Sequence, residues 1–328
     1  MGLVGGRKLS RVTIPVVLAA LVGLLAGTGA GTSLALLAQT AAAGGSTMTT
    51  AAKFDTVPPT IAGSVIAKAT GTGQYLSGSI KRSGTFYVYA NVTDTGPAAS
   101  GVATVTANVS SIKTGATAVA LVAGTYSIGG VSYNYRSASQ TATATVAQSY
   151  SYSVTAVDNA GNSATNGSFT VTVDSTVPAG SDVQTTNAGT AGMPNAGDTI
   201  IYTYTEQVDP ESIQAGWTGA STAITVRFTL SGNTVTIWNA ANTTQLPLGS
   251  IALGAAYITT ATATFNATIV QSGATITVAL GSLTTGTVKT NSTARNMTWT
   301  PSATATDGAG NACSSTNKSE SGALDVDF

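Results

Sequence analysis

The sequence feature that most constrains the fold is a short motif that occurs twice. Residues 154–162 read Val-Thr-Ala-Val-Asp-Asn-Ala-Gly-Asn, and residues 303–311 read Ala-Thr-Ala-Thr-Asp-Gly-Ala-Gly-Asn. The alternating Val, Thr and Ala positions suit a half-buried strand. The Asp-x-Ala-Gly-Asn that follows suits a tight turn, because Asp can accept backbone hydrogen bonds and Gly can adopt a positive φ. A strand and turn repeated in this way predicts two tandem β domains.

Two similar proline segments mark where these domains begin. Residues 55–60 read Asp-Thr-Val-Pro-Pro-Thr, and residues 174–179 read Asp-Ser-Thr-Val-Pro-Ala. Because Pro fixes φ and lacks an N–H donor, each segment belongs before a first strand. We therefore expect a linker over residues 44–56, a first domain over 57–175 and a larger second domain over 176–328.

Short alternating segments predict the strands of both domains. The first domain has seven or eight such segments, which is the pattern of an immunoglobulin-like (Ig-like) sandwich. Its expected strands are 61–67, 85–93, 102–109, 119–122, 126–135, 141–146, 150–157 and 168–173. Those of the second domain are 196–206, 223–230, 234–239, 251–258, 261–270, 275–280, 297–306 and 323–328. Asp209 followed by Pro210 also predicts the start of a helix.

Both domains resemble known bacterial modules. The first resembles bacterial Ig-like repeats in its Pro-Pro-Thr opening and its copy of the turn motif. The second resembles Ig-like domains of bacterial surface and S-layer proteins, which open with Gly-Asp and a strand ending before Val-Asp-Pro, and close on Asp-x-Ala-Gly-Asn. The matching positions are Gly197, Asp198, Glu206, Val208, Asp209, Pro210, Asp307, Gly310 and Asn311. The resemblance implies an all-β chain of two tandem Ig-like β-sandwich domains, and such modules are mostly scaffolds and spacers.

The N-terminal segment has the layout of an export signal. Basic residues end at Arg11, and the residues from Val12 to Ala43 carry no charge. A basic start, an apolar run and a small-residue cleavage site characterise signal peptides. The apolar run is also long enough to span a bilayer. Residues 1–43 are therefore predicted to be a signal peptide or membrane anchor, the only part of the chain in a membrane, with the rest outside the cell.

The composition excludes several functions. Only 8% of residues are charged, and the acidic residues outnumber the basic ones after residue 43, which argues against nucleic-acid binding. The chain has no His and a single Cys, Cys313. The absence of His removes the commonest general base and zinc ligand. We expect no enzyme. The remaining enzymatic hypothesis is a glycosidase-like pair, Glu206 and Asp209. Together with Glu211 these acids could instead hold Ca²⁺. Their structural interpretation is that Glu206 ends a strand, Asp209 caps a helix and Glu211 favours its positive end.

Two sets of residues are candidates for binding. Oxygen atoms of the repeated turns, at Asp158, Asn162, Asp307 and Asn311, could bind Ca²⁺ or could only stabilise the turns. No other cofactor is expected. A group of tyrosines could bind a glycan if exposed, or could pack into the core. Alternation with Ser places Tyr150 and Tyr152 on one face. The tyrosine candidates are Tyr133, Tyr135, Tyr150 and Tyr152.

These features predict a non-enzymatic exported structural or adhesion module of the bacterial cell envelope or extracellular matrix. The alternative is a carbohydrate-binding module. The expected partners are a cell-envelope component, a glycan or other copies of the chain. Self-association is expected if the uncharged segments 261–269 or 275–279 lie at a sheet edge, where strands can be added. If both segments are central, their lack of charge is ordinary.

Overall fold

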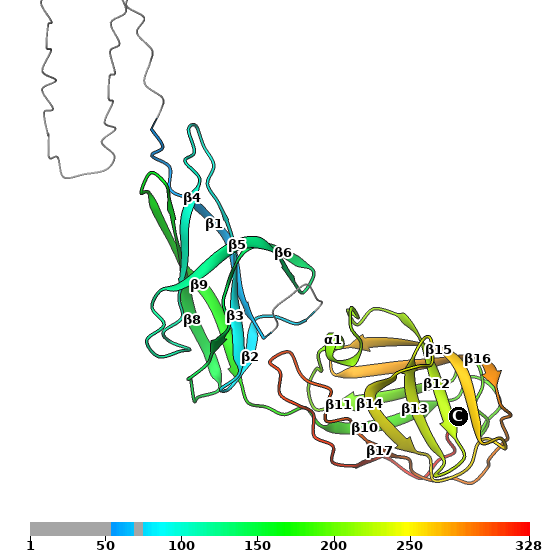
Figure 1. Ribbon diagram of the computed structural model, residues 1–328. Coiled ribbons are helices and arrows are strands. Elements are labelled where there is room, and N and C mark those ends of the chain that lie inside the picture. The colour runs from blue at the N-terminus through cyan, green and yellow to red at the C-terminus, as the bar shows by residue number, and fades with distance from the viewer. Residues whose placement is uncertain (1–53, 69–74) are drawn as a thin grey trace, which may run out of the picture. The chain divides into compact units, whose positions relative to one another are not determined.

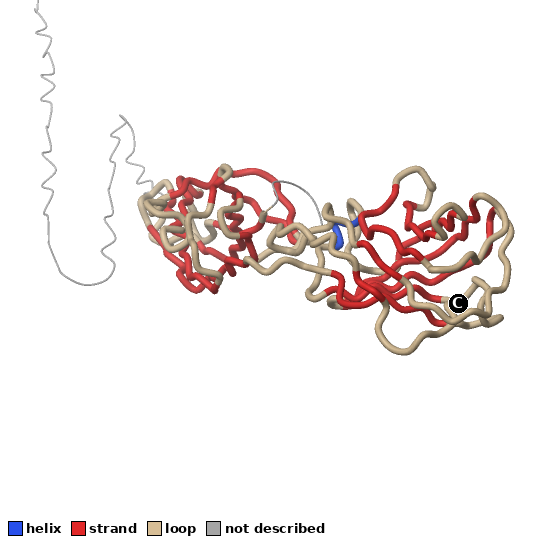
Figure 2. The backbone as a smooth tube through the Cα atoms, turned by 90° about the horizontal axis from the view of Figure 1, so that it is seen from below, coloured by secondary structure: helices blue, strands red, loops and turns tan. Residues whose placement is uncertain are grey.

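The computed structural model describes residues 54–68 and 75–328, which belong to one compact unit whose helices and strands are all β strands except one short helix (Figures 1 and 2). The expected signal peptide or anchor at 1–43 and the linker as far as residue 53 lie outside the described residues. No helix within the described ranges is both long and apolar enough to cross a membrane. The all-β prediction is therefore confirmed for the described chain, in which the strands form two sheets.

The first sheet contains nine strands. They are β1 (Thr60–Ala67), β2 (Ser79–Lys81), β3 (Thr85–Thr93), β4 (Val102–Asn108), β5 (Val119–Ile128), β6 (Val131–Ser137), β7 (Gln140–Thr141), β8 (Gln148–Asp158) and β9 (Ser163–Asp174). Hydrogen bonds connect them in the order β1-β3-β6-β5-β4-β8-β9-β2, and β7 pairs with β3. The β2–β9 pair is parallel and the others are antiparallel.

Two of the strand predictions for this sheet were wrong. The segment 126–135 is not one strand, because Gly129 and Gly130 both adopt a positive φ, 58° and 76°, and turn the chain between β5 and β6. Two central residues with positive φ characterise a tight hairpin turn. The expected strand 141–146 is reduced to the short β7, after which the chain leaves the ladder.

The second sheet also contains nine strands. They are β10 (Gly180–Thr186), β11 (Thr199–Tyr204), β12 (Thr222–Thr229), β13 (Thr234–Asn239), β14 (Gln245–Ala252), β15 (Thr262–Ser272), β16 (Thr275–Thr285), β17 (Thr298–Thr300) and β18 (Lys318–Ser319). Their order is β10-β11-β16-β15-β12-β13-β14-β17-β18. The expected helix start is confirmed, since α1 (Pro210–Ile213) begins after Asp209, whose side chain accepts a hydrogen bond from Glu211 N.

The end of the second sheet differs most from expectation. The segment 323–328 forms no strand and makes a single bridge, between Asp325 and Arg295. The segment 297–306 contributes only β17, and the predicted strand 251–258 overlaps β14 only at residues 251 and 252. Strand β10 was missed, because its sequence lacks an alternating apolar pattern.

Each sheet encloses its own hydrophobic core, as in a β-sandwich. Alternate residues of β11 point inward, including Tyr202 and Tyr204. Trp299 is fully buried against both, with ring centroids 5.2 and 4.8 Å apart and edge-on geometry. Its indole N–H donates to Leu248 O at 2.7 Å, which satisfies the one polar atom of the ring. The core of the second sheet is therefore built around this aromatic group.

The two uncharged segments expected to favour self-association are central. Strand β15 lies between β12 and β16, and β16 lies between β11 and β15. Both backbone edges of each strand are thus occupied within the chain. Strand addition through these segments, which required an exposed edge, is excluded by this topology.

We predict that Cys313 is unreactive in the native protein. Its side chain is 3% exposed, and burial, with the nearby Glu206 carboxylate, raises the pKa of the thiol to about 11. Thiolate is the reactive form, so labelling by a disulfide reagent at pH 8 should be about 100-fold slower in the native protein than in urea. Stoichiometric labelling of the native chain, or a covalent dimer on non-reducing gels, would contradict this placement.

Candidate metal centre

Most of the acidic side chains gather in three groups. The chain has 13 Asp and Glu residues, all within the described ranges. Nine of the 13 form three groups of three, in which one carboxylate oxygen from each member lies within 4.8 Å of the others. The groups are Asp55, Asp94 and Asp158; Asp174, Glu206 and Asp307; and Glu320, Asp325 and Asp327. A chain this poor in charge therefore concentrates its carboxylates in a few places.

The repeated turn fixes the central carboxylate of the first group. Asp158 ends β8 and is 2% exposed. Its Oδ1 accepts hydrogen bonds from the backbone N–H groups of Ala160 and Asn162, at 2.9 and 2.8 Å, and its Oδ2 accepts from Asn162 Nδ2 at 2.8 Å. Gly161 completes the turn with a φ of 91°, which favours Gly. The motif thus folds around its own Asp side chain.

The second copy of the motif folds in the same way. Asp307 Oδ1 accepts from Gly310 N and Asn311 N, at 2.6 and 2.8 Å, and Oδ2 accepts from Asn311 Nδ2 at 2.8 Å. Its backbone N–H donates to Asn311 O at 3.1 Å, as Asp158 N does to Asn162 O at 3.0 Å. The two turns therefore present equivalent buried carboxylates, since Asp307 is 3% exposed.

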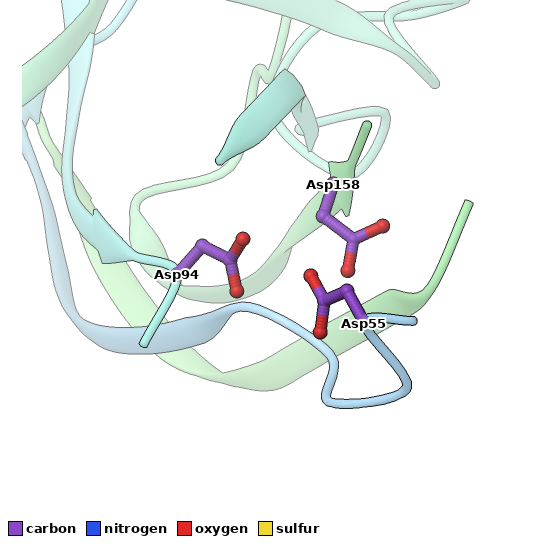
Figure 3. A group of neighbouring side chains, drawn as sticks. All are labelled: Asp55, Asp94 and Asp158. Atoms are coloured by element: carbon purple, nitrogen blue, oxygen red, sulfur yellow. The ribbon is translucent and has the colours of Figure 1, made fainter. Parts of the chain in front are cut away.

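Three separate segments bring the first group together (Figure 3). Asp55 precedes β1, Asp94 directly follows β3, and Asp158 ends β8. In Figure 3 the three carboxylates point toward a common space between these segments. The group therefore joins the entrance of the first sheet to the ends of two of its strands.

Backbone N–H groups orient the two remaining carboxylates. Asp55 accepts from Val57 N at 3.0 Å and from Ser100 N at 2.8 Å, and these bonds, that from Val57 foremost, lower the pKa of Asp55. Asp94 Oδ2 accepts from Gly101 N at 2.6 Å, whereas its Oδ1 is buried without a hydrogen-bond partner. A buried carboxylate oxygen without a partner is costly, and a cation would satisfy it.

No basic side chain in the described part of the chain pairs with this group. Within the described ranges the single ion pair joins Lys68 Nζ to Asp209 Oδ2, at 2.9 Å, and neither residue belongs to any of the three groups. Like charges held this close repel one another, and burial strengthens the repulsion because it lowers the local dielectric constant. The first group is therefore an electronegative site without a positive partner among the residues that the structure describes.

The second group occupies the corresponding position in the second sheet. Asp174 precedes β10 as Asp55 precedes β1, and Asp307 belongs to the second copy of the turn. Glu206 is the second residue after β11, whereas Asp94 is the first after β3. The strand pairs also correspond, since β10 pairs with β11 as β1 pairs with β3, antiparallel in both cases.

Glu206, like Asp94, has one buried carboxylate oxygen without a hydrogen-bond partner. Its Oε1 is buried without a hydrogen-bond partner, and burial, followed by the charges of Asp307 and Asp174, raises the pKa of Glu206. Both groups thus combine turn-held carboxylates with one oxygen that no protein donor satisfies.

The donor set fits a hard divalent cation. Ca²⁺ prefers oxygen ligands, about six to eight of them at about 2.3–2.6 Å. Oxygens on opposite sides of such an ion are about 4.8 Å apart, so one ion can touch all three members of a group. Zinc and softer metals prefer His and Cys ligands, which these groups lack. Asp55, Asp94 and Asp158 would hold one ion, and Asp174, Glu206 and Asp307 another.

The Asp and Asn side chains of the two turns have different roles in the structure. Asp158 and Asp307 each belong to a group, whereas the side-chain N–H groups of Asn162 and Asn311 donate to these carboxylates and so support the turns. The members that sequence reasoning missed as ligands are Asp55, Asp94 and Asp174, and Glu206 was considered only together with Asp209 and Glu211. An available signal was the Asp at the start of both proline segments. Calcium binding itself stays a prediction.

The four tyrosine candidates do not form an exposed row. Tyr152 is 3% exposed, its hydroxyl contacts Ser64 Oγ at 3.1 Å, and its ring lies 5.6 Å from that of Phe169. Tyr135 and Tyr150 are half-buried against the first core, and Tyr133 packs beside Tyr89, with ring centroids 5.7 Å apart. The alternation that places Tyr150 and Tyr152 on one face thus turns both toward the core.

The proposed glycosidase pair is not assembled as a pair. Asp209 is fully buried, caps α1 and forms the ion pair with Lys68. Glu206 instead belongs to the group with Asp174 and Asp307. The two residues therefore have different partners. The cap expected at Asp209 is confirmed, whereas Glu206 lies two residues beyond the end of β11 and does not end a strand.

Comparison with known proteins gives little further information. No protein-family model matches this chain, and no curated protein matches it. Among solved structures, it is similar to the crystal structure of dimeric latent PorU from Porphyromonas gingivalis, with 11% sequence identity and a TM-score of 0.22. The match covers 72% of this chain and 20% of that chain, so the chain spans about a fifth of the solved chain. Likeness at this level supports no statement about function.

We predict that Asp94→Asn abolishes calcium stabilisation of the first sheet. At a Ca²⁺ concentration about 100 times Kd, the melting transition of the first sheet in the wild-type protein should rise by roughly 5–10 °C. The variant should lose this gain, yet match or exceed the wild type in chelator, because it removes one of three repelling charges. Calorimetry measures both effects. Glu211→Gln, which removes a carboxylate outside the three groups, is the control and should keep the full response to Ca²⁺.

We predict that Asn162→Ala destabilises the first sheet by roughly 1.5–3 kcal/mol in urea unfolding, because a hydrogen bond to a charged carboxylate is lost. The matched control is Asn159→Ala, whose side chain donates only to the backbone oxygens of Ser100 and Gly101. That change should cost about 0.5–1.5 kcal/mol. Equal effects of the two substitutions would argue against the supporting role of Asn162.

Proposed function

We propose that this protein is a non-enzymatic structural or adhesion module of the bacterial cell exterior, built from two Ig-like sandwiches that each bind Ca²⁺ at the entrance. The observation that carries the proposal is the recurrence of a three-carboxylate group at the same topological position in both sheets. The acid that follows the second paired strand differs in type and exact position, Asp94 directly after β3 and Glu206 two residues after β11, yet a carboxylate is kept.

The recurrence supports a role for the charge itself. Either group alone could be a by-product of turn formation, because Asp158 and Asp307 are needed by their turns. The other members, Asp55 and Asp94, and Asp174 and Glu206, lie outside the turn motif, and their carboxylates add repulsion that folding must overcome. A bound cation converts that repulsion into attraction, which gives a reason for the same arrangement in both sheets.

Calcium also connects the site to the cell exterior. Extracellular modules commonly bind Ca²⁺ with dissociation constants of about 10⁻⁴–10⁻³ M, which three carboxylates can provide. Such weak sites fill where Ca²⁺ is abundant and stay empty at the low concentrations inside cells. The basic and apolar layout of residues 1–43 supports export independently. The weak Ca²⁺ affinity expected of the sites and the export-signal layout therefore both support a location outside the cell.

The arrangement suits a mechanical role better than a catalytic one. An ion at Asp55, Asp94 and Asp158 would fasten the segment before β1 to the ends of β3 and β8. An ion at Asp174, Glu206 and Asp307 would likewise fasten the segment before β10. Each ion would restrain the point where the chain enters a sandwich, so that binding of Ca²⁺ stiffens a spacer without requiring a reaction centre.

The carbohydrate-binding alternative has less support from the structure. It depends on tyrosine faces available for stacking on sugar rings, and Tyr150 and Tyr152 pack toward the core. A glycan array with the intact protein distinguishes the two functions. Binding of a defined glycan that is lost on Tyr133→Ala, with unchanged melting temperature, would favour the alternative.

We predict that the folded chain is exposed on the outside of producing cells and depends on Ca²⁺. Proteinase K added to intact cells in millimolar Ca²⁺ should leave a resistant core, and EGTA should make the same core cleavable near residues 55 and 174. Immunoblotting of the fragments measures this. A chain that stays full-length in EGTA until the cells are lysed would contradict the proposed location. Identical fragments with and without EGTA would contradict the role of Ca²⁺.

A further inference from the structure

The third carboxylate group lies in a different structural context from the other two. The group consists of Glu320, Asp325 and Asp327. All three belong to the C-terminal segment, residues 319–328, which contains no copy of the turn motif. One carboxylate oxygen from each lies within 4.8 Å of the others. Beyond β18 the segment forms no strand, and its one β-bridge joins Asp325 to Arg295. Hydrogen bonds of the acidic side chains therefore contribute to holding the segment against the second sheet.

The group is deeply buried on one side and open on the other. Glu320 is 5% exposed and Asp327 is 1% exposed, whereas Asp325 lies at the surface. Glu320 Oε2 accepts from Met297 N at 2.9 Å, but Glu320 Oε1 is buried without a hydrogen-bond partner. An ion could therefore enter beside Asp325 and reach an oxygen that the protein leaves unsatisfied.

Asp327 is held in place by two hydroxyl groups. Thr185 Oγ1 and Tyr257 Oη donate to its two carboxylate oxygens, each at 3.3 Å. Burial, followed by the charges of Glu320 and Asp325, raises the pKa of Asp327 to about 7. No Lys or Arg forms an ion pair with any member of the group among the described residues. The Asp327 carboxylate is thus held in a defined position, but no basic side chain among the described residues pairs with the group.

We propose that Glu320, Asp325 and Asp327 bind one Ca²⁺ ion, which fastens the C-terminal segment to the second sheet. Three oxygen donors at this spacing can all touch one Ca²⁺, and its flexible coordination accepts the remaining ligands from water or peptide oxygens. The smaller Mg²⁺ demands a tighter octahedral arrangement and gives up its water less readily. The site is separate from those at the entrances and does not depend on the proposed function.

The segment has a packing role that the ion would protect. Phe328 is fully buried, its ring lies 5.5 Å from that of Phe228 and 5.4 Å from that of Tyr257, and its carbonyl oxygen accepts from Gly192 N. Asp327 is adjacent, so repulsion among the three carboxylates acts on the residue before this anchor. Binding of Ca²⁺ would remove the repulsion and keep Phe328 in the core.

Hydrogen exchange of the intact protein tests the proposal directly. At Ca²⁺ about 100 times Kd, exchange that requires release of the ion should slow about 100-fold in peptides covering residues 319–328. Mg²⁺ at the same concentration should protect them less. Unchanged exchange of these peptides in the wild type on addition of Ca²⁺ would overturn the proposal, and equal protection by Mg²⁺ would overturn the assignment to Ca²⁺.

Two variants assign the effect to this group. Asp325→Asn should remove one bound Ca²⁺ in equilibrium dialysis and abolish the protection of residues 319–328, and its exposed position allows the variant to fold. Asp94→Asn is the matched control, because it removes a carboxylate from the first group and should leave this protection unchanged. Protection that persists in Asp325→Asn, or is lost in Asp94→Asn, would contradict a site at the C-terminal segment.

Discussion

Hydrogen bonding between an Asp carboxylate and the backbone of its own turn is the interaction on which the candidate sites depend. Asp158 and Asp307 each accept two backbone N–H groups and one side-chain N–H group, and are almost completely buried as a result. These bonds keep each carboxylate in one orientation. A fixed negative charge is thereby placed at the end of each sheet, and the acidic side chains nearby determine whether a cation is needed.

The low charge content of the chain gives this arrangement its significance. Thr, Ser, Ala and Gly cover much of the surface, so few ionic contacts are available to compensate a misplaced carboxylate. Of the 13 acidic residues, Asp198 and Asp209 are buried with backbone donors of their own, and nine others belong to the three groups. Acidic residues thus occur mainly where a backbone donor or a shared site receives them, which is the distribution expected when cations supply the compensating charge.

The sequence was sufficient for the fold class, the turns and the helix cap, because each of these depends on local chemistry. The alternation in β3 and β8 and the Asp-Pro sequence at α1 are read directly from neighbouring residues. Strand limits were less predictable. Gly129 and Gly130 end β5 although the residues on both sides favour strands, and β10 forms because β11 provides its hydrogen-bonding partner. Pairing of this kind is a tertiary effect that a single sequence does not display.

The candidate sites show the same division between local and tertiary information. Asp158 and Asp307 were identifiable because the turn motif repeats, whereas Asp94 follows β3 with no motif of its own. Its proximity to Asp55 follows from the antiparallel pairing of β1 with β3, which brings the start of one strand beside the end of the other. The same pairing of β10 with β11 brings Asp174 beside Glu206.

The strand topology therefore creates the arrangement of carboxylates at the candidate sites. An acid before the first strand and an acid after its antiparallel partner must meet at one end of the sheet, and the turn Asp joins them there. Any chain with this topology and these three acids would assemble the group on folding, and the unfolded chain would not possess it. Binding of a cation is then linked to folding itself, so that Ca²⁺ in the surroundings would stabilise only the folded form.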